Sequence, residues 1–447
     1  MPAPCDAGRR PRAPRATPPR RHAEGGTFGA LGRPDARSGG FGDHRVTRQH
    51  VQVLVIVAPG QGSQTPGMLL PWLELPNFGD RIDWLGTVAD LDLRAHGTTS
   101  DADTIRDTAI AQPLIVATGL VTLLELFPHP HDAYSLLGAG AGHSVGEITA
   151  AAATGVLSAE QAMVFVRERA RAMARAAAVT STGMAAVLGG DREEVLATIA
   201  RHGLTAANDN GAGQIVAAGT IEQLAAFEAD PPAKAKVRPL SVAGAFHTSH
   251  MAPARDELAK LARAMTTHDP RVALLSNADG QVLASGRDVL TRLVSQVSNP
   301  VRWDLCMQAF ADLGATGILE IPPAGTLTGL VKRALPGIAT FALRSPDDLE
   351  GARAFVAEHG EMNILDTQPA WRLVVSPAKG TVRISEGLTE GVLLEPRTFV
   401  AAVVTLNEEH PVVAEYGGAI VEWLVTDGDP VAPGQPLLRL HPTAEDL

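Results

Sequence analysis

The chain has 447 residues, enough for two or three domains, and 45% of them are hydrophobic, as in an ordinary soluble globular protein. No window of about 18 uninterrupted apolar residues occurs, so we expect no membrane span. The two cysteines, Cys5 and Cys306, are far apart, which excludes a disulfide framework and a zinc site and predicts a cytoplasmic protein. The net charge of −11 divides into +6 for residues 1–50, which hold ten Arg and four acids, and −17 for the rest, a balance that argues against non-specific nucleic-acid binding.

Residues 1–50 are rich in Arg, Pro, Ala and Gly and have no apolar periodicity, so we predict a disordered tail. The Arg clusters suggest a transit peptide or a nucleic-acid-binding tail. Against both interpretations, six prolines within the first 19 residues prevent an amphipathic helix. A third interpretation is an over-extended reading frame whose true start lies near Val51, where folded sequence begins.

The first buried strand is predicted at residues 51–57 because they form a run of β-branched side chains. It leads into a tight Gly-rich loop, 60–64 (GQGSQ), and loops at this end of a strand often carry function in α/β proteins. A helical pattern follows at about 101–127. The apolar run 133–137 (AYSLL) predicts a second strand.

The segment 142–146 (GHSVG) follows that expected strand and precedes an alanine-rich helical run from Ile148. Strand, tight turn and helix form the context in which Gly-x-Ser-x-Gly is a nucleophile elbow. The Ser144 hydroxyl would stand at the top of the sheet, and the Val145 N–H at the helix start would point into the same space. A Gly-rich turn with a capping serine is the alternative interpretation.

The rest of the chain up to about residue 360 predicts an α/β fold with a hydrolase-like core and a short parallel sheet. Two helices are expected in 148–178, with a break at Gly155. Residues 183–241 then give the order β-α-β-β-α-β, which is the pattern of an inserted ferredoxin-like subdomain at about 180–243. Its elements are expected at 184–188, 191–202, 205–208, 214–218, 221–227 and 236–242. Further strands at 274–277 and 318–321 and a last helix at 347–358 complete this unit.

Five separated motifs in 51–355 resemble the malonyl-CoA:acyl carrier protein transacylases, the acyltransferase family of fatty-acid and polyketide synthesis. They occur in the family's order and are 60–64 (GQGSQ), 142–147 (GHSVGE), Arg169, 244–247 (GAFH) and 299–303 (NPVRW). The resemblance implies transfer of a malonyl group from malonyl-CoA to the phosphopantetheine thiol of an acyl carrier protein.

The resemblance assigns the catalytic roles. Ser144 would be the nucleophile that carries the malonyl ester, and His247 the general acid and base. A backbone carbonyl, which by motif match belongs to Arg302, would orient His247 in place of an Asp. The backbone N–H groups of Gln61 and Val145 would bind the oxyanion.

Two further residues would select the substrate. The resemblance places Arg169 against the free malonyl carboxylate, which a guanidinium binds with two parallel hydrogen bonds. Its neighbours Arg167, Arg171 and Arg175 are expected to be solvated. In related polyketide enzymes a Phe before the catalytic His accompanies malonyl, and Phe246 stands there, so malonyl is the expected substrate.

Residues 361–447 contain an internal repeat, in which 389–396 aligns with 426–433 at an offset of 37. Short β patterns with Gly and Pro turns predict a small C-terminal β barrel that resembles a biotinyl/lipoyl domain. That family attaches its cofactor to a Lys on a hairpin, here residues 406–410 (LNEEH), where no Lys is present; Lys379 lies in the wrong half. We therefore expect a degenerate carrier fold without a cofactor.

The runner-up function is an α/β-hydrolase-like esterase or thioesterase, which shares Gly-x-Ser-x-Gly and a later His. It would need an acid between them in chain order, and it lacks the 60–64 loop and Arg169. A non-enzymatic carrier, suggested by the C-terminal domain alone, is weakened by the missing Lys. The expected partners are malonyl-CoA and an acyl carrier protein, without nucleic acid, membrane or metal.

Overall fold

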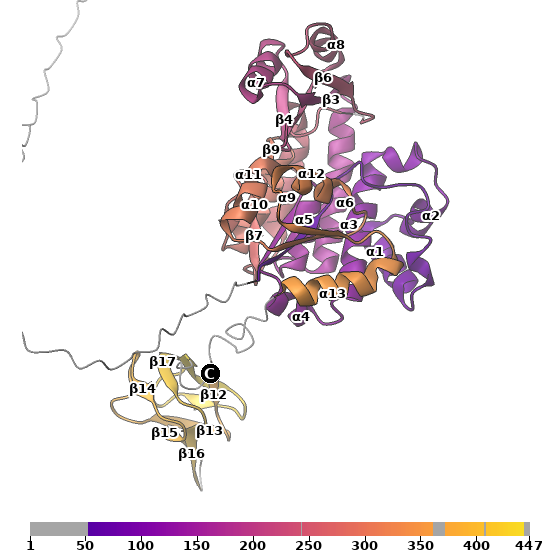
Figure 1. Cartoon of the computed structure of the whole chain (residues 1–447). Coiled ribbons are helices and arrows are strands. Elements are labelled where there is room, and N and C mark those ends of the chain that lie inside the picture. The colour runs from indigo at the N-terminus through magenta and orange to yellow at the C-terminus, as the bar shows by residue number, and fades with distance from the viewer. Residues whose placement is uncertain (1–51, 243, 361–371, 406–407, 442–447) are drawn as a thin grey trace, which may run out of the picture. The chain divides into compact units, whose positions relative to one another are not determined.

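The computed structural model describes residues 52–242, 244–360, 372–405 and 408–441. The predictions for the tail at 1–50, for Cys5 and for the hairpin residues 406 and 407 lie outside these ranges. Within them the chain is a mixture of helices and sheets, as the expected α/β class requires (Figure 1).

A six-stranded sheet with the order β11-β10-β1-β2-β7-β8 lies at the centre of the larger unit. Its first five strands are parallel, and only β8 runs antiparallel to its neighbour. The central strand β1 pairs Ile56 with Leu319 on one side and with Gly140 on the other. The strands are β1 (Leu54–Ala58), β2 (Ala139–Gly142), β7 (Ala273–Leu275), β8 (Val282–Leu283), β10 (Gly317–Glu320) and β11 (Ala339–Ala342).

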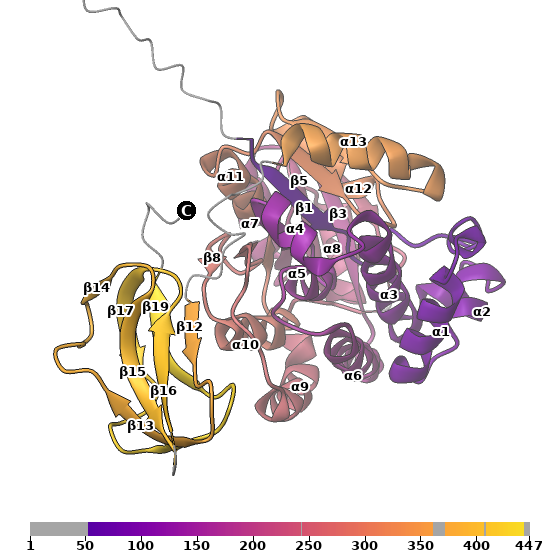
Figure 2. The same ribbon diagram turned by 90° about the horizontal axis from the view of Figure 1, so that it is seen from below.

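Both faces of this sheet are buried, because alternate β1 side chains enter two different hydrophobic clusters. Leu54 and Ile56 belong to the larger cluster and Val55 and Val57 to the smaller. Seen from below, Figure 2 shows α5 and α10 on one side of β1 and α11 on the other. The larger cluster holds α1 (Phe78–Ala89), α3 (Thr108–Leu126), α5 (Gly146–Ala153), α6 (Ala159–Ala177), α9 (Ala252–Ala264), α10 (Gly286–Gln296) and α13 (Leu349–His359); the smaller holds α11 (Trp303–Asp312) and α12 (Thr326–Ala334).

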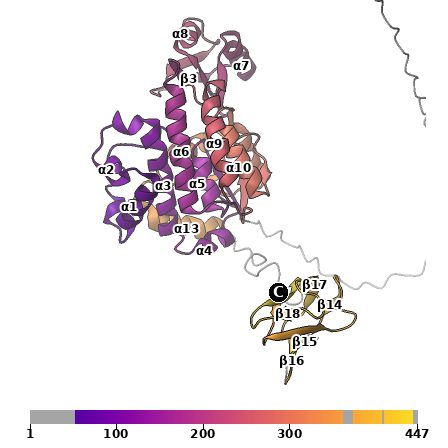
Figure 3. The ribbon, with the colours of Figure 1, turned by 180° about the vertical axis from the view of Figure 1, so that it is seen from behind.

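Helix α3 is, within the described ranges, the one helix with the length and hydropathy of a membrane span. Most of it is buried in the larger cluster, where it packs against α5 and α6 (Figure 3). This burial is expected of the central helix of a folded core, so α3 is weak evidence for a membrane span.

A second sheet belongs to residues 182–239 and has the order β6-β3-β5-β4, all antiparallel. Its strands and helices follow in the predicted order, and Figure 1 shows α7 and α8 gathered beside it. Strand β9 of the core adds to β4 in parallel, which joins this unit to the core. The elements are β3 (Thr182–Gly189), α7 (Arg192–Arg201), β4 (Thr205–Asp209), β5 (Gln214–Thr220), α8 (Ile221–Ala229), β6 (Ala235–Pro239) and β9 (Val301–Arg302).

Residues 372–441 form two four-stranded sheets, β12-β19-β17-β14 and β16-β15-β13-β18, around their own hydrophobic cluster. Exchanging β12–β15 with β16–β19 converts one sheet order into the other, so the two halves are related by an approximate two-fold. Strands β14 and β18 lie 37 residues apart, as the internal repeat predicts. The strands are β12 (Arg372–Val375), β13 (Gly380–Ile384), β14 (Leu393–Leu394), β15 (Thr398–Val404), β16 (Glu409–Ala414), β17 (Gly418–Trp423), β18 (Pro430–Val431) and β19 (Pro436–His441).

The prediction of a strand at 133–137 is wrong, because residues 133–136 belong to helix α4 (Pro130–Leu136), and Leu137 is the extended residue that follows it. The strand before the elbow is β2, whose sequence is AGAG. Glycine and alanine have low strand propensity, but β2 is buried throughout between β1 and β7 and has no room for larger side chains. Tertiary packing therefore overrides local propensity here.

Candidate active site

The turn between β2 and α5 holds Ser144 in the left-handed region, at φ 52°. A Cβ on Gly142 would overlap the Gly146 carbonyl group, and a Cβ on Gly146 would overlap the carbonyl oxygen of Ala58. Both glycines are therefore needed for α5 to begin directly against the sheet. Left-handed backbone at a serine is strained, and such strain is found at functional sites when the surrounding packing imposes it.

His247 completes a Ser–His pair across 103 residues of sequence. Its Nε2 lies 2.7 Å from the Ser144 Oγ, and its Nδ1 lies 2.8 Å from the backbone carbonyl oxygen of Gln296. A carbonyl can only accept, so Nδ1 carries the proton and Nε2 is left to accept the Ser144 hydroxyl proton. The ring is thus fixed in the tautomer that a general base requires.

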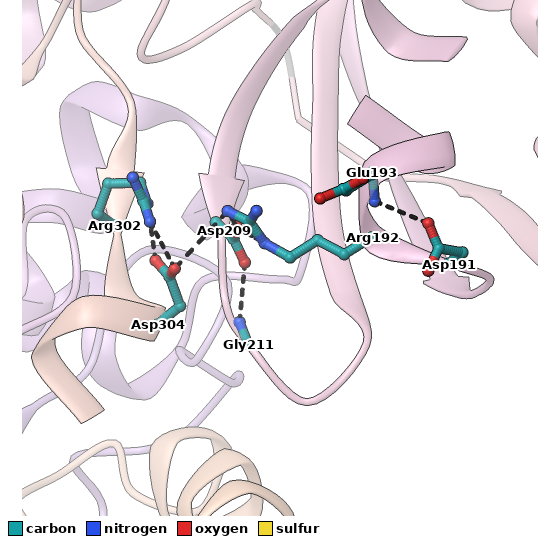
Figure 4. Close-up of polar contacts among 7 residues, drawn as sticks. All are labelled: Asp191, Arg192, Glu193, Asp209, Gly211, Arg302 and Asp304. Carbon is teal, nitrogen blue, oxygen red and sulfur yellow. Dashed lines mark hydrogen bonds and ion pairs between the residues drawn. The ribbon is translucent and has the colours of Figure 1, made fainter. Parts of the chain in front are cut away.

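The predicted orienting carbonyl, that of Arg302, is wrong. Gln296 is the last residue of α10, where helix carbonyls lack partners within the helix, and its carbonyl faces His247. Arg302 instead donates its N–H to the Asn277 carbonyl at 2.7 Å, and its guanidinium binds Asp304 at 2.7 and 2.8 Å. Figure 4 shows this side chain facing Asp304, with Arg192 and Asp209 alongside.

Arg169 is buried, at 1% exposure, in the middle of α6. Its Nη1 donates to the Gln112 Oε1 at 2.6 Å, and its Nη2 to the Gln296 Oε1 at 2.9 Å and to the Ser144 Oγ at 3.4 Å. Its Nε has no hydrogen-bond partner in the part of the chain that the structure describes. Burial lowers the pKa of Arg169 to about 10, so the guanidinium stays charged at neutral pH.

Burial, with Arg169 as the next cause, lowers the pKa of His247 to about 3. The imidazole is therefore neutral near pH 7, as a base that accepts the Ser144 proton must be. Together these three residues place a hydroxyl group, a neutral imidazole and a fixed positive charge at one point.

Two backbone N–H groups in the segments around the Ser144–His247 pair have no acceptor among the described residues. Among the hydrogen bonds of the described residues, neither the Gln61 N–H nor the Val145 N–H donates to another protein group. Val145 precedes the first residue of α5, and Gln61 follows β1 in the 60–64 loop. The Gln61 side chain contacts Thr108 at 3.2 Å and accepts from Gln112 at 3.3 Å, which ties the loop to α3.

Other residues close to the site in space or in sequence do not enter the pair. Phe246 is buried, at 6% exposure, in the larger cluster next to His247. His143 contacts the Asn210 Oδ1 at 2.8 Å, as a structural role would require, and His250 lies in a short 3-10 turn. The three neighbours of Arg169 form ion pairs with carboxylates nearby: Arg167 with Glu168, Arg171 with Asp90, and Arg175 with Glu257.

Three amide side chains hold the site and were not predicted. Asn277 accepts the Ser144 N–H at 2.8 Å, Gln296 donates to the Ser144 carbonyl at 3.0 Å, and Gln112 binds Arg169. All three are buried. Gln112 interrupts an apolar stretch, which was an available signal, but Asn277 and Gln296 have polar sequence neighbours and gave none.

A metal site has no basis in the described ranges, where no three His, Cys, Asp or Glu side chains are grouped as ligands. Cys306 is a buried free thiol, and burial raises its pKa far above the ordinary value.

Residues 55–352 match the family model described as the acyl transferase domain. Over 303 residues the chain is 50% identical to the malonyl CoA-acyl carrier protein transacylase of Mycobacterium tuberculosis, covering 67% of this chain and 98% of the relative. The corresponding protein of Bacillus subtilis is 31% identical over 316 residues, covering 69% and 98%.

Solved structures of malonyl transacylases also match this chain. The crystal structure of MCAT from Mycobacterium tuberculosis matches with a TM-score of 0.65 and 49% identity, over 67% of this chain and 99% of that one. A complex of a type II PKS acyl-carrier protein with its malonyl-transacylase matches with a TM-score of 0.63 and 28% identity, over 68% and 99%.

Proposed function

We propose that this chain, which belongs to the acyl transferase domain family, transfers a malonyl group from malonyl-CoA to the thiol of an acyl carrier protein. The observation that carries the proposal is the Ser144–His247 hydrogen bond of 2.7 Å with the buried Arg169 guanidinium 3.4 Å from the same Oγ. A nucleophile beside a fixed cation suits an acyl group that ends in a carboxylate.

The transfer takes place in two balanced steps. Ser144 Oγ attacks the thioester carbonyl carbon while His247 Nε2 takes the hydroxyl proton; the C–S bond breaks, and the departing CoA thiolate takes that proton from His247. The phosphopantetheine thiol of the carrier then attacks the malonyl-Ser144 ester. His247 takes the thiol proton and returns it to the Ser144 Oγ as the ester C–O bond breaks.

We assign the oxyanion of both tetrahedral intermediates to the Gln61 and Val145 N–H groups. Support comes from the absence of an acceptor for either group in the described part of the chain, and from the position of Val145 at the start of α5, where the helix dipole favours negative charge. A Cβ on Gly60 would lie 2.8 Å from the His143 carbonyl oxygen, so Gly60→Val must displace this loop. Loss of one donor costs about 3–4 kcal/mol of transition-state stabilisation in a hydrolase, so we expect a fall in kcat of about 100-fold or more.

Substrate selection in this proposal rests on Arg169 and Phe246. The guanidinium would bind the malonyl carboxylate, and its Nε is still without a partner among the described residues. Phe246, buried beside His247, would fill the space that an α-methyl group needs. A single methyl group is worth about 1–3 kcal/mol in such a pocket, so malonyl is preferred over methylmalonyl.

The finer fold assignments belong to the same proposal. We assign 51–360 to a hydrolase-like acyltransferase domain, with a ferredoxin-like subdomain at about 180–243; the sheet order β6-β3-β5-β4 supports this subdomain. We assign 361–447 to a degenerate biotinyl/lipoyl-like barrel, supported by the two-fold exchange of its sheets. Thr405 and Glu408 flank its β15–β16 hairpin, and the domain's single Lys, Lys379, lies between β12 and β13, so we propose that no biotin or lipoyl group is attached. A cytoplasmic location completes the proposal.

The hydrolase alternative is not favoured, because the group that orients His247 is the Gln296 carbonyl where an α/β-hydrolase would supply an acid. The test is to incubate the chain with malonyl-CoA, with and without holo acyl carrier protein, and to measure the carrier's mass and free malonate. Transfer predicts malonyl-carrier that depends on the enzyme, with little malonate. Malonate released at the same rate with and without carrier would support a thioesterase and refute the proposal.

A further inference from the structure

Glu147 is a buried acid for which the proposed chemistry has no use. It is the second residue of α5 and is 2% exposed. Its Oε1 accepts the backbone N–H of Asn277 at 3.1 Å, and its Oε2 accepts the side-chain amide of Gln296 in a short hydrogen bond. Burying a carboxyl group costs free energy unless hydrogen bonds offset the loss of its hydration. The presence of a buried, hydrogen-bonded Glu147 beside the site therefore needs an explanation.

Asn277 and Gln296, two of the hydrogen-bond partners of Glu147, also hold Ser144; the Ser276 side chain is a third partner. The Asn277 Oδ1 accepts the Ser144 N–H at 2.8 Å, and its Nδ2 donates to the Gly142 carbonyl at 2.7 Å. The Gln296 Nε2 donates to the Ser144 carbonyl at 3.0 Å. The N–H and the C=O of Ser144, a residue in strained backbone, are thus held by the side chains of two residues that also bind Glu147. Asn277 binds Glu147 through its backbone N–H, and Gln296 binds it through its side-chain amide.

Gln296 also connects Glu147 to the other two residues of the site. Its Oε1 accepts from Arg169 at 2.9 Å, and its backbone carbonyl accepts from His247 at 2.8 Å. A glutamine amide has donors on one end and an acceptor on the other. The carboxyl group on one side therefore fixes the amide so that its oxygen faces the guanidinium.

We propose that Glu147 is a positioning residue that fixes the backbone of Asn277 and the side-chain amide of Gln296, and through them sets the place of Arg169 and of the Ser144–His247 pair. The inference rests on the proposed function. It predicts that losing the carboxylate harms the discrimination of malonyl from acetyl, because Arg169 loses the fixed acceptor that aims it. A residue with a merely structural role would change stability and leave that discrimination intact.

The decisive variant is Glu147→Gln, assayed at pH 8, where the wild-type carboxyl group is ionised. A carboxamide offers one acceptor to two donors, so either the Asn277 N–H loses its partner or the Gln296 amide turns and presents its NH₂ to Arg169. We expect a fall of about tenfold or more in the malonyl-over-acetyl ratio of kcat/KM, with a rise in KM for malonyl-CoA and slower acylation of Ser144 in a single turnover.

A matched control exists in Glu320, a second fully buried carboxyl group. It accepts the N–H groups of Leu327 and Thr328 at 2.9 and 2.8 Å and so caps α12, and it contacts none of the site residues. Glu320→Gln should lower the melting temperature while the malonyl-over-acetyl ratio stays within about twofold of the wild type.

A second variant keeps the test decisive if Glu147→Gln fails to fold. Gln296→Leu removes the amide but keeps the backbone carbonyl that orients His247, and it should lower the same ratio. Where both variants fold, the double variant should be no worse than Gln296→Leu alone, because the two residues act in series.

The outcomes separate the two proposals. Wild-type protein that transfers malonyl, together with a Glu147→Gln variant whose ratio and acylation rate are unchanged, would overturn the role of Glu147 alone. Wild-type protein that forms no malonyl ester would overturn the proposed function itself.

Discussion

Arg169 carries a buried charge whose hydrogen-bonding capacity is only partly used. Glutamine oxygens bind its Nη1 and Nη2, and its Nε has no partner among the described residues. The groups in direct contact with the guanidinium are neutral, and the Glu147 carboxyl group acts on it electrostatically. Under the proposed function, this arrangement is preorganised for the malonyl carboxylate.

We expect Arg169→Ala to lower kcat/KM for malonyl-CoA by about 10- to 100-fold, the value of a hydrogen bond to a charged group. Acetyl-CoA, which lacks the carboxylate, should be used no worse than by the wild type. Initial rates with both substrates measure this, and Arg169→Lys should recover only part of the loss because a single ammonium group cannot bind a carboxylate through two parallel donors. An equal loss for both substrates would contradict the assigned role.

His247 and Glu147 affect the pH dependence of the free energy of unfolding in opposite directions. Folding lowers the pKa of His247 from 6.5 to about 3, so below pH 6.5 the unfolded chain binds a proton that the folded chain does not. This contribution makes the free energy of unfolding decrease as the pH is lowered. Burial raises the pKa of Glu147 from 4.5 to about 7, so between pH 7 and 4.5 the folded chain holds a proton that the unfolded chain does not. This contribution makes the free energy of unfolding increase as the pH is lowered. Between pH 4.5 and 6.5 the two contributions cancel.

Because the two contributions have opposite signs, removing one group or the other should change the pH dependence of stability in opposite directions. As pH falls from 6.5 to 4.5, His247→Asn should become more stable relative to the wild type and Glu147→Gln less stable, each by about 1.4 kcal/mol per pH unit. Asn tolerates the left-handed backbone at this position, where φ is 60°. Chemical unfolding at three pH values measures the differences. Parallel curves for all three proteins would show that neither group has a shifted pKa.

At the residue scale the sequence predicted the groups that sit in motifs and missed those that support them. Ser144, His247 and Arg169 meet as the resemblance implies. Gln296 and Asn277 lie on other elements and carry no motif, and the carbonyl that orients His247 depends on where α10 ends. Neither contact can be predicted from spacing, because both arise from the way α10 and β7 pack against the elbow.

At the scale of elements, the contact between β2 and α5 depends on two glycines. We expect Gly142→Ala and Gly146→Ala each to destabilise the transferase domain by about 3 kcal/mol or more, because the added methyl group would overlap backbone atoms that cannot move independently. Both the melting temperature and the rate of malonyl transfer should fall.

Gly329, inside α12, is the matched control. A Cβ there would meet only the Arg333 Nη1, at 3.8 Å, so Gly329→Ala should be neutral or stabilise by about 0.4–1 kcal/mol. Equal effects at all three glycines would mean that close packing is not what the elbow requires.

The helices α3, α5, α6, α7, α8 and α13 were predicted, whereas α1, α11 and the Ser285-capped α10 were missed and the strand beside the elbow was placed wrongly. The break at Gly155 separates α5 from α6, and the six elements of residues 182–239 appear in the predicted order. The apolar run 133–137 is helical, while AGAG forms the strand. Local propensity fails there because the sheet interior beside α5 admits only the smallest side chains.

At the scale of the whole molecule, the site and the C-terminal sheets use separate residues. The described site residues all lie between Gln61 and Arg302, and residues 374–440 form a hydrophobic cluster of their own. A chain ending at residue 360 should therefore keep kcat/KM for malonyl-CoA within about twofold of the full chain. Steady-state rates measure this, and a loss of tenfold or more would show that the C-terminal domain takes part in catalysis.

The measurement that tests the central claim most directly is the intact mass of the protein after brief exposure to malonyl-CoA without carrier, for the wild type and for Ser144→Ala. The account predicts one malonyl adduct on the wild type and none on the variant. An adduct of equal yield on Ser144→Ala, or CoA release with no adduct on the wild type, would contradict it.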